Sequence, residues 1–193
     1  MGTLFVDKLD PQSGTSLEIG SSGDTITIPS GATITNSGTA TGFGETNAPS
    51  FYAYGASNQS ISTATYTLAQ QNTENWDTNS AYNNSTYTFT VPSGQGGKYA
   101  FYFGGEMEAI GANNVYYRSK LYKNGTYLPN SEQAGQIIFG GASNNQDYAN
   151  SSFALNLSAG DTIQHYVFQN SGGSKNLYTG FFFGGFKIAS WVH

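Results

Sequence analysis

The sequence of 193 residues contains no cysteine and few charged residues. Without cysteine the chain forms no disulfide, no Cys-ligated zinc site and no thiol nucleophile. Charged residues make up 10% of the chain, and seven Lys and Arg against twelve Asp and Glu give a formal net charge of -5. Because a nucleic-acid-binding surface needs clustered positive charge, we expect no nucleic-acid partner.

Long hydrophobic runs are also lacking. No segment approaches the roughly 18 apolar residues of a membrane span, and residues 1–9 lack the apolar core of a signal peptide. We therefore expect a chain that does not insert into a membrane and carries no signal peptide.

Catalytic motifs are scarce as well. The sequence has two histidines, and His165 lies in phase with Ile163 and Val167 in a predicted strand, which favours a structural role. We find no nucleophile elbow, phosphate loop or dinucleotide fingerprint. The expectation is a protein without enzymatic activity and without a cofactor.

One carboxylate pair is a candidate for cation binding. Glu106 and Glu108 are two residues apart and therefore lie on one face of a strand. In a trimer six such carboxylates would offer oxygen ligands to Ca²⁺. The alternative, which we favour, is a solvated strand end without a metal.

Aromatic residues are abundant but unevenly placed. They make up 15% of the chain, yet the first 48 residues contain only Phe5 and Phe43. This division predicts three parts: an anchoring arm at 1–12, a repeat stem at 13–48 and a head domain at 49–193.

The stem consists of a short repeat. Ser-Gly turns begin at Ser13, Ser22, Ser30 and Ser37, and each turn is followed by an alternating apolar and polar segment. Such short strands are stable only when they stack on neighbours, so we expect stems of identical chains to pack together. A flexible Ser/Gly linker is the alternative. The predicted packing residues are Leu17, Ile19, Ile26, Ile28 and Ile34.

The arm contains a short apolar segment, Thr3, Leu4, Phe5 and Val6. An apolar extended segment with no local packing partner is either frayed or paired with another protein. We therefore predict that it anchors the chain.

Period-two alternation dominates the head. It occurs at residues 87–91, 99–103, 152–157 and 163–168, with turn signals between these segments. Asn124-Gly125 is the sharpest turn signal, because both residues tolerate the positive φ of a hairpin turn. About eight to ten strands without a persuasive amphipathic helix predict an all-β sandwich or jelly roll.

The segment from Leu177 to Phe186 carries aromatic rings in both phases. Read as one strand, it places Tyr178, Phe182 and Phe186 on one face and Phe181 and Phe183 on the other. We predict that one face lies in the core and the other meets a second subunit; cover by a loop of the same chain is the alternative. Tyr99, Phe101 and Phe103 are grouped with these residues as core or trimer interface.

These strands, taken in order, resemble the trimeric jelly-roll superfamily of complement globular heads and tumour necrosis factors. The matching segments lie at 50–53, 87–92, 97–103, 121–125, 154–163 and 178–183. The resemblance implies about ten antiparallel strands and a homotrimer around an aromatic-lined axis. The chain departs from animal members in lacking a collagen-like stem.

The amino-acid sequence at 9–15 and 23–33 is similar to the N-terminal portions of bacteriophage virion proteins. That similarity implies a structural protein on the virion surface, assembled in the host cytoplasm: a capsid decoration (cement) protein or short fibre whose arm docks on other capsid or tail proteins. The alternative is a tail fibre, receptor-binding protein or lectin-like module that recognises host glycans.

Glycan recognition would fall to polar loops of the head. Amide side chains bond sugar hydroxyls and aromatic faces stack on sugar rings, although the same residues are ordinary in loops. The candidate contact residues are Trp76, Asp77, Asn145, Asp147 and Tyr148.

Overall fold

The computed structural model describes residues 9, 11, 13–35, 37, 48–109, 115–128, 136–139 and 147–190, with the backbone alone at 136–139 and Asp147. The chain divides into two compact units, Met1–Phe43 and Gly44–His193. Within the described ranges no helix is long and apolar enough to cross a membrane.

The described part of the first unit, which includes 13–35, contains turns but no strand. Gly14, Gly23 and Gly31 have φ values of 79°, 95° and 85°, the left-handed conformation that a Ser-Gly turn requires. Three of the four predicted turns are therefore present, and the fourth, which begins at Ser37, continues outside the described residues. Over 13–35 the predicted short strands are absent from the single chain, which is consistent with their small hydrophobic faces.

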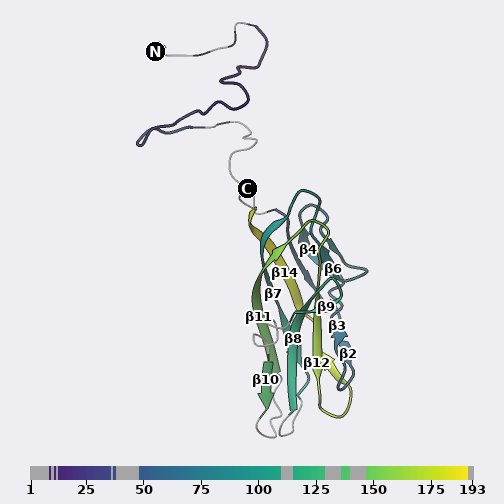
Figure 1. Cartoon of the computed structure of the whole chain (residues 1–193). Coiled ribbons are helices and arrows are strands. Elements are labelled where there is room, and N and C mark those ends of the chain that lie inside the picture. The colour runs from purple at the N-terminus through teal and green to yellow at the C-terminus, as the bar shows by residue number, and fades with distance from the viewer. Residues whose placement is uncertain are drawn as a thin grey trace. The chain divides into compact units, whose positions relative to one another are not determined.

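The second unit is a sandwich of two antiparallel sheets, which confirms the all-β prediction (Figure 1). Sheet A runs β2-β13-β7-β14-β1-β4, with β11 on the other edge of β7. Its strands are β1 (Ser50–Tyr54), β2 (Gln59–Ile61), β4 (Thr73–Asp77), β7 (Gly97–Met107), β11 (Asp147–Leu157), β13 (Lys175–Leu177) and β14 (Phe182–Ser190).

Sheet B runs β10-β8-β12-β6-β5, with β3 paired to β12 and β9 paired to β8. Its strands are β3 (Thr67–Leu68), β5 (Tyr82–Asn83), β6 (Thr88–Thr90), β8 (Val115–Lys123), β9 (Thr126–Tyr127), β10 (Gln136–Phe139) and β12 (Thr162–Gln169). The hairpin of β8 and β9 turns at Asn124 and Gly125, with φ values of 51° and 72°, as the sequence predicts.

Aromatic side chains from both sheets fill the space between them. The ring of Phe51 stacks on Tyr82 and on Phe89, each at a centroid distance of 5.0 Å, and meets Phe183 edge-on at 5.0 Å. Burial of such large rings stabilises the head through the hydrophobic effect. Tyr99, Phe101 and Phe103 of β7 belong to the same core and are at most 1% exposed.

The prediction of one continuous strand from Leu177 to Phe186 is wrong. β13 ends at Leu177 and β14 begins at Phe182, with a turn between them in which Gly180 has a φ of 91°. The backbone N–H of Gly180 donates to the carbonyl of Gly55, and that of Gly55 donates to the carbonyl of Phe181. These contacts hold the turn, so Tyr178 does not share a strand with Phe182.

Gly55 leaves room for the ring of Phe181, which is 1% exposed. A Cβ at Gly55 would collide with that ring, whereas a Cβ at Gly173 meets nothing within 4 Å. We expect Gly55→Ala to lower the free energy of unfolding by about 1–3 kcal/mol through overpacking, and Gly173→Ala to change it by less than about 0.5 kcal/mol. Urea denaturation checks both, and equal stability of the two variants would contradict this packing.

Candidate functional site

The outward face of sheet A carries a cluster of large apolar side chains. Trp76 is 47% exposed, Phe186 37% and Ile188 49%, which is unusual for side chains of this size on a folded domain. We call this surface the aromatic face; it comprises Tyr52, Tyr54, Trp76, Tyr102, Phe182, Phe186 and Ile188.

A row of residues crosses the sheet at the centre of this face. Tyr52 pairs with Trp76 on one side and with Gly184 on the other, and Gly184 pairs in turn with Tyr102. The rings of Trp76 and Tyr52 stack at 5.2 Å, and those of Tyr52 and Tyr102 at 6.2 Å. A Cβ at Gly184 would collide with the Tyr102 ring, so glycine allows the rings to lie flat along the row.

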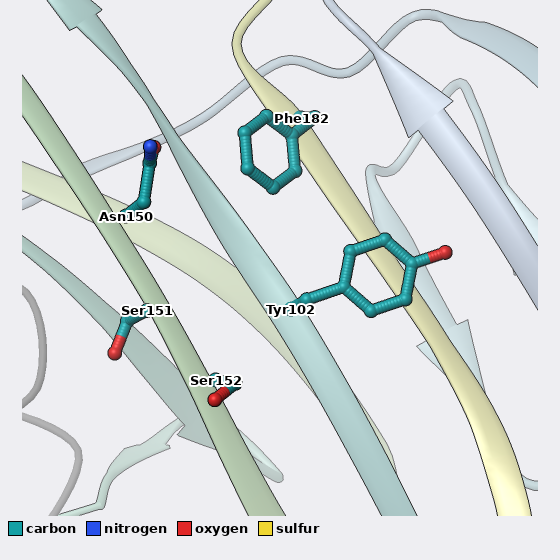
Figure 2. A pocket seen from close by; sticks show the side chains of 5 residues that line it. All are labelled: Tyr102, Asn150, Ser151, Ser152 and Phe182. Carbon is teal, nitrogen blue, oxygen red and sulfur yellow. The ribbon is translucent and has the colours of Figure 1, made fainter.

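A hollow of about 570 Å³ opens on the other half of the face. Figure 2 shows Tyr102 and Phe182 on neighbouring strands, with Asn150, Ser151 and Ser152 on the adjacent β11. The two rings form an apolar wall, and the Asn150 amide and the Ser152 hydroxyl give the hollow a polar side, whereas the Ser151 hydroxyl is buried. A smaller depression of about 220 Å³ lies between Trp76 and Phe186.

The aromatic face therefore has two unlike halves. Trp76 on β4 and Ser152 on β11 lie in the same row but on opposite edges of the five strands β4, β1, β14, β7 and β11. The β4 half presents exposed rings, and the β11 half presents the hollow. Such a surface offers two different contact patches.

The structure separates the roles of the two predicted cation-binding carboxylates. Glu108 accepts hydrogen bonds from the backbone N–H and side-chain amide of Asn176 and pairs with Lys175 at 3.3 Å. The backbone N–H of Asn176 and the ammonium of Lys175 lower the pKa of Glu108. Glu106 instead lies opposite Tyr148 in the pairing of β7 with β11. A side-chain hydrogen bond between Glu106 and the Tyr148 phenol raises the pKa of that phenol.

No group of three or more His, Asp or Glu that suits a metal ion occurs in the described parts of the chain. Both carboxylate oxygens of Glu108 accept hydrogen bonds from β13, one from Lys175 and the other from Asn176. In the described structure of a single chain, Glu108 thus links β13 to the end of β7.

Those predicted glycan-contact residues that the structure describes do not gather at one place. Trp76 lies on β4 and the 56% exposed Tyr148 on β11, at opposite edges of sheet A. The carboxylate of Asp77 accepts hydrogen bonds from the backbone N–H groups of Ala81 and Tyr82, so it anchors its own loop. Asp147 begins β11, and Asn145 lies outside the described residues.

His165 lies in the core with no exposed surface. The side-chain amide of Gln71 donates to Nδ1 at 2.8 Å, which leaves the proton on Nε2 to reach the hydroxyl of Ser119 at 2.6 Å. Gln71 and Ser119 are also fully buried, so a substrate in solution cannot reach this trio. Burial lowers the pKa of His165 to about 3 and keeps the ring neutral.

The interface residues predicted from the sequence fall into two groups. Phe182 and Phe186 lie on the aromatic face, whereas Phe181 and Phe183 are at most 1% exposed and lie in the core. Tyr178 lies in the turn before β14. Sequence reasoning missed Tyr52, Tyr54 and Tyr102, although their alternation with the buried Phe51, Ala53 and Phe101 is readable from the sequence.

The predicted stem residues are exposed in the single chain. Leu17, Ile19, Ile26, Ile28 and Ile34 are 47–61% exposed. The predicted anchor, Thr3 to Val6, lies outside the described residues. Among the residues that the structure describes, this repeating exposed series is left uncovered.

Solved structures with a similar fold come from the complement and tumour necrosis factor families. The chain is 18% identical to the globular domain of zebrafish complement 1qA protein, covering 74% of this chain and 99% of that chain with a TM-score of 0.48. It is 16% identical to Eiger TNF from S. frugiperda, covering 75% and 94% with a TM-score of 0.50. It is 14% identical to murine APRIL, covering 72% and 98% with a TM-score of 0.49.

No protein-family model and no curated protein sequence matches the chain. The likeness to Eiger TNF, together with the two antiparallel sheets, defines the fold class of the head as a C1q/TNF-like sandwich. The resemblance in fold inferred from the strand order is thereby confirmed.

The buried His165 makes stability depend on pH. The folded state keeps a pKa of about 3, against the usual 6.5, so the unfolded chain takes up a proton that the folded chain refuses. Stability from this group is complete above pH 6.5 and is lost as the pH falls toward 3. We expect the unfolding free energy to fall by about 1.4 kcal/mol per pH unit below about pH 6.

Urea titrations at a series of pH values test this dependence. The matched variant His165→Gln should have a flat profile between about pH 6 and 5. The lowered pKa values of Glu108 and Asp161 also stabilise the fold, but that contribution is lost only as the pH falls below their ordinary values of 4.5 and 3.8. The same acid slope in both proteins would show that His165 is not responsible.

Proposed function

We propose that the chain forms a homotrimer through the aromatic face of sheet A. The exposed rings of this face carry the proposal, because an open apolar surface on a folded domain is the usual mark of a protein interface. The C1q/TNF-like sandwich supports it, since the resemblance to that superfamily implies a trimer around an aromatic axis.

The two halves of the face suit a threefold ring. In a closed ring each protomer contacts its two neighbours through two different patches, unlike the identical patches of a twofold dimer. The exposed rings beside Trp76 form one patch, and the hollow beside Ser152 forms the other. We place Trp76 of each protomer in the hollow of the next, between the wall formed by Tyr102 and Phe182 and the polar residues of β11.

The mass of the protein in solution tests the assembly. We expect about three times the 20.6 kDa chain mass for the wild type, and a monomer for Trp76→Ala, which removes the inserting ring. Ser152→Trp fills the hollow and should also give a monomer. Thr90→Trp adds the same side chain at an exposed position on sheet B and should leave the trimer intact.

The measured masses answer two separate questions: whether a trimer forms, and whether the aromatic face forms its interface. A monomeric wild type would remove the trimer altogether. A wild-type trimer that persists in both Trp76→Ala and Ser152→Trp would keep the trimer but place its interface elsewhere. Circular dichroism of each variant confirms that the sandwich is folded when the mass is read.

We further propose that the trimer is a non-enzymatic structural protein on the surface of a bacteriophage virion, either a capsid decoration protein or a short fibre. In this arrangement the arm docks on the particle, the stems pack together and the head projects outward. The exposed apolar series from Leu17 to Ile34 supports packed stems, because identical neighbours would cover it. The inaccessibility of His165 and Ser119 supports a role without catalysis.

Labelled virions test the location. We expect an antibody against the head to mark intact particles, and deletion of residues 1–12 to abolish incorporation while the purified protein stays trimeric. Signal confined to the tail would exclude the capsid version. Normal incorporation of the deleted protein would overturn the anchoring role of the arm.

A further inference from the structure

Asn124-Gly125 is the only Asn-Gly pair in the sequence. In such a pair the backbone nitrogen of glycine can attack Cγ of asparagine, because no Cβ on the glycine obstructs the approach. A C–N bond forms, ammonia leaves, and the resulting succinimide is opened by water to aspartate or isoaspartate. Both residues are exposed at the tip of the β8–β9 hairpin, where water is available.

The fold restrains the side chain of Asn124 at both ends. Its oxygen accepts hydrogen bonds from the backbone N–H of Thr162 at 2.7 Å and from the Thr162 hydroxyl at 3.2 Å. Its nitrogen donates to Oδ1 of Asp161 at 2.8 Å. The backbone N–H of Asn124 also donates to the carbonyl of Thr162. Attack by Gly125 requires the side chain to rotate out of these contacts.

Asp161 lies at the centre of these contacts. We call the contacts among Lys123, Asn124, Ser158, Asp161 and Thr162 the junction. Its second oxygen accepts from the backbone N–H of Ser158 at 2.7 Å and pairs with Lys123 at 2.7 Å, and its carbonyl accepts from the backbone N–H of Val91. Partial burial raises the pKa of Asp161, but the hydrogen bonds from Lys123, Asn124 and Ser158 outweigh it, so the pKa is lowered. The carboxylate thus joins its own turn to the β8–β9 hairpin, and the main-chain carbonyl of the same residue holds Val91.

We propose that Asn124 is a self-modification site whose succinimide chemistry is held back by Asp161 and Thr162, and whose product opens the junction. While the junction is closed, the amide is held away from Gly125. When the junction opens, the amide is free to react. The rate of modification therefore follows the fraction of molecules in which the junction is open.

The product cannot restore the closed junction. Deamidation replaces the amide that donates to Asp161 with a carboxylate that can only accept. Two carboxylates would then face each other across a distance that is now a 2.8 Å hydrogen bond, with Lys123 as the cation paired with Asp161. Like charges at this separation repel, so the β8–β9 hairpin loses this side-chain contact with the turn at Asp161.

Peptide mass spectrometry of the incubated full-length protein measures conversion of Asn124 to aspartate and isoaspartate. We expect Asp161→Asn to raise the native rate about tenfold, because a hydrogen bond to a charged group is lost. The control Glu108→Gln removes a comparable paired carboxylate elsewhere on the head and should leave the rate unchanged. Equal native rates in the wild type and Asp161→Asn would overturn the restraint.

A second measurement, on the protein unfolded in urea, does not depend on the folding of a variant. There we expect Asn124 to convert faster than every other asparagine of the chain, at equal rates in the wild type and Asp161→Asn. An unfolded chain in which another asparagine converts first would overturn the assignment of the site.

The variant Asn124→Asp supplies one product directly. It should unfold at a lower temperature than the wild type at neutral pH, and the difference should shrink in acid as the facing carboxylates are neutralised. An unchanged unfolding temperature at neutral pH would show that the product leaves the junction closed.

Discussion

The head depends on the packing of aromatic rings against glycines in the two central strands of sheet A. Gly105 lies against Phe181, Gly184 beneath Tyr102 and Gly185 against Phe101. Because these positions lack a Cβ, rings pack closely on both faces of the same strands. The same glycine positions therefore determine how rings pack in the core and how they pack on the aromatic face. A side chain at Gly184 would reshape the surface, and one at Gly185 would displace a core ring.

Local patterns in the sequence predicted much of the sandwich. Alternation along β7 and β12 identified the strands, because each has one face in the core. Asn124-Gly125 predicted its hairpin, since the left-handed conformation is a property of those two residues alone. The aromatic residues from Leu177 to Phe186 predicted one strand, although a turn interrupts this segment. Gly180 marked that turn, but the hydrogen bonds with Gly55 that hold it join residues far apart in the sequence.

The candidate sites were less predictable, because the partner of a polar side chain is set by tertiary structure. Asp77 has a composition typical of a binding loop, yet its carboxylate holds the backbone of Ala81 and Tyr82. Glu106 and Glu108 share a spacing but have different partners, Tyr148 and Asn176. The aromatic face joins strands from both ends of the head sequence, so no single segment reveals it. Only the alternation of Tyr52 with Phe51 and of Tyr102 with Phe101 pointed to it.

The stacked row on the aromatic face has a consequence for the thermodynamics of association. Trp76, Tyr52 and Tyr102 already restrict one another's rotation within a single chain. A side chain that is free before binding loses conformational entropy when an interface orders it, at roughly 0.5–1.5 kcal/mol each. The stacking restricts these rings before any second copy binds. The surface is therefore preorganised, and the ordering cost falls on the folding of the head and not on the encounter between copies.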